Sequence, residues 1–540
     1  MRSELLLGDE AIAVAALDAG IAGAFAYPGT PSTEIFECVD QRTRGDDTVS
    51  ARWSSNEKVA YEEALGMSFA GKRALVSMKH VGLNVASDPL MSSALTGVNG
   101  AMVLVVADDP GMHSSQSEQD TRFYSDFAKL PLFEPRDQQQ CYDMTREAFE
   151  LSDRVRLPVM VRVVTRIAHS RAVVQRAEPR GQLPPPADAD ERTSVKRWAL
   201  IPANARERYA HLLALQSELV AYAEGSDYNE LRIAGARGVI CSGVANNYVD
   251  EALGGREDDS LLRVGVYPLP VAKIRELVDH CDEIVVVEEG QPFIEPRLGG
   301  ILGIPGKHVR GKLTGDVPAT GELTPDSVAE ALGAPTRPRF GVQSDLPGRP
   351  PGLCRGCPHG DTFGALVAAT KDYERPILFS DIGCYTLGVL PPYEAVHSAV
   401  DMGASVAMAT GAARAGAHPV VCTIGDSTFT HSGMTGLIGA ARADANMTVL
   451  ILDNSTVAMT GAQETMAHGD ELVRVIAGLG VDERHLHVFE PRPKRHQELV
   501  ALLQREIAHP GLSVVVSQRA CVHAKRRHKE RRQAATTGAC

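Results

Sequence analysis

The sequence has no long apolar run and few aromatic residues. No segment approaches the roughly 18 uncharged apolar residues that would span a bilayer, and aromatic residues make up only 5% of the 540. The first twenty residues carry Glu4, Asp9 and Glu10, where a secretion signal needs an uninterrupted apolar stretch. We therefore expect no membrane span, no secretion signal and a cytoplasmic protein.

Basic residues are also in deficit. Lys and Arg total 55 against 68 for Asp and Glu, which gives a formal charge of -13 and predicts no general attraction to nucleic acid or anionic membranes. The basic run 525–532 is interpreted as a solvated tail. Without a secretory route, the ten cysteines are expected to be free thiols or metal ligands.

Short β-branched strands alternate with helical patterns along the chain, which predicts an α/β fold with parallel sheets. The length suggests about three or four domains. Two proline-rich stretches, 176–194 and 336–351, are read as linkers. They divide the chain into modules at 1–175, 195–335 and 352–522, followed by a basic tail at 523–540.

Polar residues follow two predicted strands of the third module. Gly425, Asp426 and Ser427 end one strand, and Asp453 and Asn454 end the next. The carboxyl ends of neighbouring parallel strands lie side by side, so Asp426 and Asn454 can converge on one magnesium ion, with the Thr456 carbonyl as third ligand. A tight turn that caps a helix is the alternative.

A CxxC motif, Cys354 and Cys357, has the spacing of metal ligands. Cys384 and Cys521 each follow a predicted strand and could complete a four-cysteine site. A zinc site with His359 and scattered buried thiols are the alternatives. Five further cysteines show no ligand spacing and are expected to be core or surface thiols: Cys38, Cys141, Cys241, Cys281 and Cys422.

Two positions in the first module stand at predicted helix starts. Glu57 follows a short strand, and an apolar helix face would bury it. A carboxyl group in an apolar cleft stays protonated more readily and can donate a proton. The alternative is that Glu57 is an ordinary acidic residue that the helix dipole favours at a helix N-terminus. Thr30 is suited to cap the next helix, with Pro31 in its first turn.

These motifs resemble the 2-oxoacid:ferredoxin oxidoreductases, and most of all the large subunit of the indolepyruvate enzyme. The resemblance covers nearly the whole chain and is carried by the segments 27–32, 56–60, 78–85, 113–120, 267–270, 288–289 and 381–385, together with the Gly425-Asp426-Ser427 to Asp453-Asn454 signature. Ser427 stands where the thiamine diphosphate superfamily more often has glycine.

The resemblance implies a pyrimidine-binding first module, a transketolase C-terminal-like middle module and a diphosphate-binding third module. It assigns Glu57 to the pyrimidine ring and Thr30 to the cofactor and substrate, while His80 and Asn84 would line the substrate pocket. The residues implied to hold thiamine diphosphate are Glu57, Thr30, Gly383, Gly425, Asp426, Ser427 and Asn454. Asp426, Asn454 and Thr456 would bind Mg²⁺, and Cys354, Cys357, Cys384 and Cys521 one 4Fe-4S cluster.

The implied reaction is oxidative decarboxylation of an aryl 2-oxoacid, of the indolepyruvate or phenylpyruvate type, to an acyl-CoA. Electrons would leave through the cluster to ferredoxin or another carrier, and a smaller beta subunit would complete a dimer of heterodimers. Such large subunits usually continue into a ferredoxin-like module that is not found up to residue 540, so we expect a shortened sequence, a separate electron-relay protein or a different acceptor. A non-redox thiamine decarboxylase or carboligase is the alternative, followed by a catalytically silent binding subunit. The sequence does not determine the aryl substrate.

Overall fold

The computed structural model describes residues 2–181, 194–300, 302–336, 348 and 351–524. Its contacts group the chain into two compact units, Met1–Gly341 and Val342–Cys540. Most of both predicted linkers, and the tail from residue 525, lie outside the described residues. The predicted domain boundaries therefore stay predictions.

The first unit contains a seven-stranded sheet within its described residues, in the order β12-β6-β7-β5-β4-β2-β3. Its strands are β2 (Gly23–Ala26), β3 (Ser50–Trp53), β4 (Ala74–Lys79), β5 (Met102–Asp108), β6 (Leu132–Phe133), β7 (Val159–Val164) and β12 (Val266–Tyr267). All neighbouring pairs are parallel except β12 with β6. Both faces of β5 and β7 are buried, which explains their continuous apolar sequences.

The helices of this part are α1 (Gly8–Asp18), α2 (Thr33–Arg42), α3 (Glu57–Phe69), α4 (His80–Val85), α5 (Ser87–Thr96), α6 (Thr121–Ala128), α7 (Gln138–Val155) and α8 (Thr165–Ala168). Helix α1 packs against α2 and α7. An antiparallel ribbon of β1 (Arg2–Leu7) and β8 (Arg171–Arg176) joins the two ends of the module, with Leu7 opposite Arg171. This pairing brings α1 into contact with α8.

A second sheet of the first unit has five described strands, in the order β14-β13-β10-β11-β9. Its strands are β9 (Leu231–Arg232), β10 (Arg237–Ser242), β11 (Ser260–Val264), β13 (Glu283–Val287) and β14 (His308–Arg310). The accompanying helices are α10 (Val195–Trp198), α11 (Pro202–Gly225), α12 (Ala245–Leu253), α13 (Val271–His280), α14 (Glu295–Gly299) and α15 (Pro325–Ala331). Helix α11 packs against α5 of the preceding module, and Arg208 Nε donates to the Leu95 carbonyl at 2.8 Å.

Two fully buried arginines join these sheets. The Arg122 guanidinium lies 2.8 Å from Glu288 at the end of β13. Arg162 on β7 lies 2.6 Å from Asp108 and donates to the Glu289 carbonyl at 3.1 Å. Buried charges need such partners, and the Arg122–Glu288 ion pair and the Arg162–Glu289 hydrogen bond tie the end of β13 to the first module.

The second unit holds a six-stranded, fully parallel sheet among its described residues, in the order β16-β15-β17-β18-β20-β19. Its strands are β15 (Ile377–Ser380), β16 (Ser398–Ala399), β17 (Val420–Gly425), β18 (Met447–Asp453), β19 (Leu486–Phe489) and β20 (Leu512–Gln518). The helices and turns are α16 (Pro358–Thr370), η1 (Cys384–Val389), α17 (Ala404–Arg414), α18 (Asp426–Thr428), η2 (Phe429–Gly433), α19 (Met434–Arg442), α20 (Gly469–Gly478), η3 (Glu483–His485), η4 (Pro493–Arg495) and α21 (His496–Ile507).

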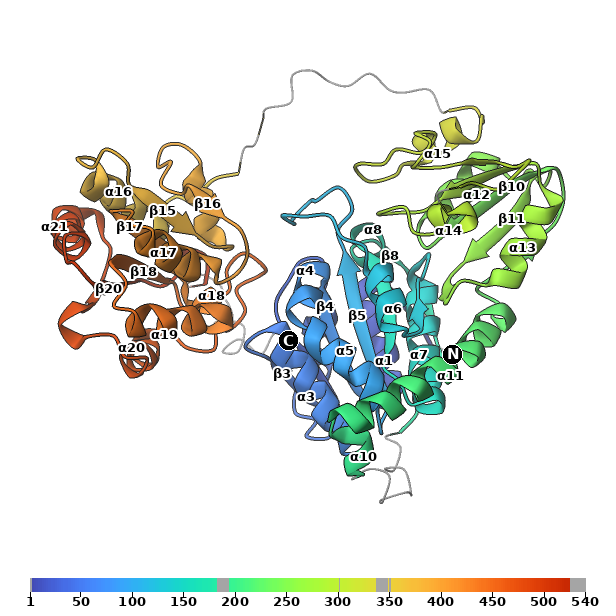
Figure 1. Cartoon of the computed structure of the whole chain (residues 1–540), viewed down its shortest axis with the longest axis horizontal. Coiled ribbons are helices and arrows are strands. Elements are labelled where there is room, and N and C mark those ends of the chain that lie inside the picture. Colours follow the sequence, from blue (N-terminus) through green and yellow to red (C-terminus); the bar gives the residue numbers. More distant parts are fainter. Residues whose placement is uncertain (1, 182–193, 301, 337–347, 349–350, 525–540) are drawn as a thin grey trace. The chain divides into compact units, whose positions relative to one another are not determined.

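Helices cover both faces of this sheet (Figure 1). Successive residues of β18 enter different cores: Val449 packs with α17, α19 and α20, whereas Leu450 packs with α16 and α21. This is the period of two expected for a strand buried on both faces. The predicted α/β class with parallel sheets is confirmed. Within the described residues, no helix is both long and apolar enough to cross a membrane.

Candidate active site

The carboxyl edge of the second unit's sheet carries the predicted magnesium ligands. β17 and β18 are parallel neighbours, with Gly425 opposite Leu452, so Asp426 and Asn454 leave adjacent strand ends. Asp426 is 2% exposed, and its Oδ1 accepts the Ser427 N–H at 2.9 Å. Its Oδ2 is buried and has no hydrogen-bond partner among the described residues.

The electrostatics of Asp426 fit a cation ligand. Burial, followed by the nearby Asp453 carboxyl group, raises the Asp426 pKa well above its usual range. An ionised carboxylate at this place therefore needs a positive partner. A carboxylate with a free, buried oxygen is the donor that a hard cation such as Mg²⁺ prefers.

Asn454 and Thr456 form a turn beside Asp426. Asn454 Oδ1 accepts the Thr456 N–H at 3.1 Å, which leaves the second lone pair of this oxygen for a metal ion. Asn454 Nδ2 lies 3.2 Å from His359 Nε2. Burial, and to a smaller extent Arg519, lowers the His359 pKa to about 4, so the ring is neutral and Nε2 can accept this bond.

Two glycines leave room for Tyr385 at the same edge. A Cβ atom on Gly425 would lie 2.6 Å from Tyr385 Cε1, and one on Gly383 would lie 2.4 Å from it. Only glycine permits this approach of backbone and ring. The residues predicted to hold the diphosphate thus lie at one sheet edge.

The four predicted cluster cysteines lie near one another in this unit. Burial, followed by Cys357, Cys521 and Cys354, raises the pKa of the Cys384 thiol to about 12. Among the described residues, no three of these sulfurs lie within 4.8 Å of one another. The Cys521 N–H donates to the Asn454 carbonyl at 3.0 Å, so the cysteine group adjoins the predicted magnesium site.

Glu57 lies in the first unit, as the first residue of α3. Asn56 caps this helix by accepting the Val59 N–H at 2.9 Å. Glu57 is 6% exposed, and its carboxyl group lies against Gly82, where an added Cβ would come within 2.6 Å of Oε1. The predicted position of Glu57 at a helix start after a short strand is confirmed.

Thr30 does not cap a helix, so that prediction was wrong. Helix α2 begins at Thr33, and Ser32 occupies the capping position. The Ser32 hydroxyl donates to the Gly29 carbonyl at 2.8 Å, and the Gly29 N–H donates to Thr33 Oγ1 at 3.0 Å. These bonds close a turn that delays the helix and leaves the Thr30 side chain outside it.

A lysine that the sequence analysis did not single out lies beside this turn. The stem of Lys79, the last residue of β4, contacts Gly29, and its Nζ donates to the Ser114 carbonyl at 3.1 Å. Burial lowers the Lys79 pKa, although the carboxyl groups of Asp109 and Glu57 oppose the shift. A lysine at the end of a buried strand is unusual, and that was the signal available in the sequence.

The two predicted pocket residues differ in exposure. His80 is 1% exposed, and its Nε2 lies 2.9 Å from the Ser117 carbonyl, while Nδ1 has no partner among the described residues. Asn84 is exposed and accepts a hydrogen bond from the Tyr124 hydroxyl. Their roles in a pocket stay predictions.

Two family models match the chain. One is described as the C-terminal TPP-binding domain of thiamine pyrophosphate enzymes and matches residues 381–517. The other, the thiamine diphosphate-binding domain of pyruvate flavodoxin/ferredoxin oxidoreductases, matches residues 14–205. The first range contains Asp426 and Asn454, and the second contains Thr30 and Glu57.

Curated relatives match almost the whole chain. The indolepyruvate oxidoreductase subunit IorA of Archaeoglobus fulgidus is 38% identical over 96% of this chain and 86% of its own length. The chain belongs to the IorA family. The corresponding subunit of Pyrococcus abyssi is 36% identical over 96% of this chain and 85% of its own. Together with the two thiamine diphosphate-binding family models, these relatives confirm the predicted family and the predicted class of thiamine diphosphate-dependent 2-oxoacid:ferredoxin oxidoreductase.

A solved structure supports the fold. The 2-oxoglutarate:ferredoxin oxidoreductase from Magnetococcus marinus, with 2-oxoglutarate, coenzyme A and succinyl-CoA bound, matches with a TM-score of 0.50 and 16% identity. The match covers 61% of this chain and 65% of that chain. At this sequence identity the similarity between the two proteins concerns the fold alone.

Proposed function

We propose that this chain, with a smaller partner subunit, catalyses oxidative decarboxylation of an aryl 2-oxoacid of the indolepyruvate or phenylpyruvate type. In the overall change the 2-oxoacid and coenzyme A give acyl-CoA, carbon dioxide, a proton and two electrons. The observation that carries the proposal is the four-cysteine group beside Asn454, because a non-redox thiamine enzyme needs no such group. The names of the relatives support the aryl substrate.

Asp426, Asn454 and the Thr456 carbonyl would hold Mg²⁺ and, through it, the diphosphate. Within the described part of the chain, Asp426 Oδ2 has no hydrogen-bond partner and Asn454 Oδ1 keeps one lone pair open, and both features fit this role. Gly383, Gly425 and Ser427 would let the backbone approach the cofactor. Bound thiamine diphosphate supplies the nucleophilic carbon and the electron sink, while the protein supplies orientation and charge.

Glu57 would hold a proton against the aminopyrimidine ring. Its carboxyl group is buried at the start of α3 in the space that Gly82 leaves. Thr30 would contact cofactor and substrate from the turn at Gly29. Lys79 offers the positive charge that a 2-oxoacid carboxylate needs in a partly dry site.

Cys354, Cys357, Cys384 and Cys521 would hold one 4Fe-4S cluster, which accepts electrons singly. A tetrahedral zinc ion with bonds of about 2.3 Å would require sulfurs about 3.8 Å apart. Among the described residues, no three of these sulfurs lie within 4.8 Å of one another, which supports the larger cluster. His359, the fourth ligand of a rival zinc site, instead lies against Asn454.

The test is the cofactor content of the complex purified without oxygen. We expect tightly bound thiamine diphosphate, about four irons per heterodimer, and a broad visible band that bleaches on addition of an arylpyruvate and coenzyme A. Thiamine diphosphate without iron would favour a non-redox decarboxylase or carboligase. Absence of both would contradict the proposal.

A further inference from the structure

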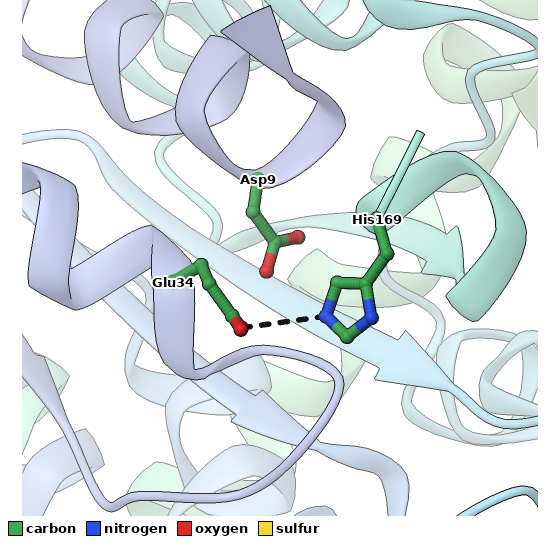
Figure 2. Close-up of side chains that lie close together, drawn as sticks. All are labelled: Asp9, Glu34 and His169. Carbon is green, nitrogen blue, oxygen red and sulfur yellow. Dashed lines mark hydrogen bonds and ion pairs between the residues drawn. The ribbon is translucent and has the colours of Figure 1, made fainter. Parts of the chain in front are cut away.

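Three potential metal ligands from separate elements converge outside the proposed magnesium, cofactor and cysteine sites. Asp9 lies in the first turn of α1, Glu34 in the first turn of α2, and His169 directly after α8 (Figure 2). One ligand atom from each lies within 4.8 Å of those of the other two. Glu34 Oε2 and His169 Nε2 are 3.4 Å apart. Among the described residues, no other trio of His, Cys, Asp and Glu meets this distance.

The Asp9 carboxyl group is the observation that points to a ligand. Asp9 is fully buried, and neither of its oxygens has a hydrogen-bond partner among the described residues. In Figure 2 its carboxyl group projects toward the Glu34 and His169 side chains. Burial, followed by the charges of Glu34 and Glu10, raises the Asp9 pKa well above its usual range. An unpaired buried carboxylate is costly, so this group must hold either a proton or a cation.

The backbone positions Asp9 firmly. A Cβ atom on the preceding Gly8 would lie 2.3 Å from the Ile167 carbonyl oxygen, so only glycine lets α1 begin against α8. The Gly8 N–H also donates to the Ser170 carbonyl at 3.3 Å. These contacts hold the start of α1 beside His169. The Glu34 and His169 side chains are 38% and 33% exposed, so an ion and its water ligands can reach them from solvent.

We propose that Asp9, Glu34 and His169 bind a divalent transition-metal ion of the zinc type. One imidazole and two carboxylates suit such an ion, and the solvent side leaves room for water as a further ligand. The negative charge of two carboxylates is balanced by the ion, which removes the cost of the unpaired Asp9. None of these residues belongs to the magnesium or cysteine sites proposed above.

The ion would also brace the turn that carries Thr30. Glu34 follows Thr30 by four residues, and the Pro31 carbonyl accepts a hydrogen bond from the His169 ring. A metal ion on Glu34 and His169 would therefore fix both ends of the segment 31–34 against α8. The effect on Thr30 rests on its proposed role, whereas metal binding does not.

The experiment is a zinc titration of the intact complex with its partner subunit. Calorimetry in saturating Mg²⁺ would compare the unchanged protein with Asp9→Asn and His169→Gln. His113→Gln is the matched control, because His113 and Glu322 are also 3.4 Å apart but belong to no such trio among the described residues. We expect the unchanged protein and the control to bind one more zinc ion per chain than either variant. Zinc should also raise the Tm of the unchanged protein and of the control more than the Tm of Asp9→Asn and His169→Gln.

Equal zinc binding by all four proteins would overturn the proposal and leave Asp9 as a protonated carboxyl group. If Asp9→Asn does not fold, His169→Gln still decides the question, because its side chain is partly exposed. Zinc binding in a complex that lacks activity with arylpyruvates would contradict the proposed function alone.

Discussion

Gly82 and Glu57 are complementary, since the space of the missing Gly82 side chain is next to the Glu57 carboxyl group. A Cβ on Gly82 would lie 2.6 Å from both Cγ and Oε1 of Glu57. Gly82→Ala should therefore displace Glu57 and weaken thiamine diphosphate binding, as measured by calorimetry. Gly66→Ala on α3 is the control, because its Cβ would meet no atom within 4 Å. Equal cofactor affinity in both variants would argue against this packing.

Glu57→Gln tests the proposed acid role of this side chain. The amide has nearly the same shape but cannot serve as an acid, so we expect kcat to fall by ~100-fold or more with little change in Tm. Glu62→Gln, on the exposed side of the same helix, should leave kcat unchanged. Full activity in Glu57→Gln would remove Glu57 from the mechanism.

Asp426→Asn tests the magnesium site. The substitution removes a buried carboxyl group whose Oδ2 has no partner in the described part of the chain. The Tm of the variant without cofactor should therefore equal or exceed that of the unchanged protein. Its affinity for Mg²⁺ in the presence of thiamine diphosphate should fall by ~10- to 100-fold or more. The exposed Asp470→Asn serves as control. A variant that keeps full metal affinity would show that Asp426 is not a ligand.

Cys384→Ser tests the cluster assignment. If four cysteines hold iron, loss of one should strip most of the iron and the visible band, whereas thiamine diphosphate remains bound. Cys422→Ala changes a buried thiol of the same unit that has no place in the proposed group. Iron content by elemental analysis should separate the two variants, and equal content would refute a cluster at these cysteines.

Asp381 should make the folding stability of the second unit depend on pH. Burial raises its pKa from 3.8 to about 7, although the Ser405 hydroxyl and N–H both donate to the carboxyl group. The folded state binds the proton more tightly than the unfolded state, so stability is greatest below pH 3.8 for this group and declines as pH rises toward 7. Asp381→Asn should flatten this dependence.

Hydrogen exchange at the Ser405 N–H is the measurement for Asp381. In the unchanged protein the protection of this amide should decline between pH 4 and 7, after correction for intrinsic exchange. The exposed Asp372→Asn should behave like the unchanged protein. A parallel decline in Asp381→Asn would assign the pH dependence to another group.

The sequence sufficed for features that are local or periodic. Parallel strands place their carboxyl ends together, so the meeting of Asp426 and Asn454 followed from two strand patterns. Glu57 at the start of α3 followed from its short strand and apolar helix face. The capping role of Thr30 was wrong because side-chain bonds of Ser32 and Thr33 close a turn that composition does not reveal.

Contacts between segments that are distant in the sequence could not be predicted from local sequence patterns. The pairing of β1 with β8, which brings Asp9 to His169, joins strands separated by most of a module. Arg122 and Arg162 were missed for a different reason, since arginine is almost never fully buried unless paired. Asp108 reaches Arg162 from the neighbouring strand of the same sheet, whereas Glu288 reaches Arg122 only when both sheets are in place.

The most direct test of the proposed chemistry is the product formed from indolepyruvate by the complex without oxygen. With coenzyme A and an oxidised ferredoxin present, we expect one molecule of acyl-CoA for every two electrons transferred to ferredoxin. Little ferredoxin should be reduced when coenzyme A is omitted. Release of the aldehyde at the same rate, with no reduction of ferredoxin, would contradict the proposed chemistry.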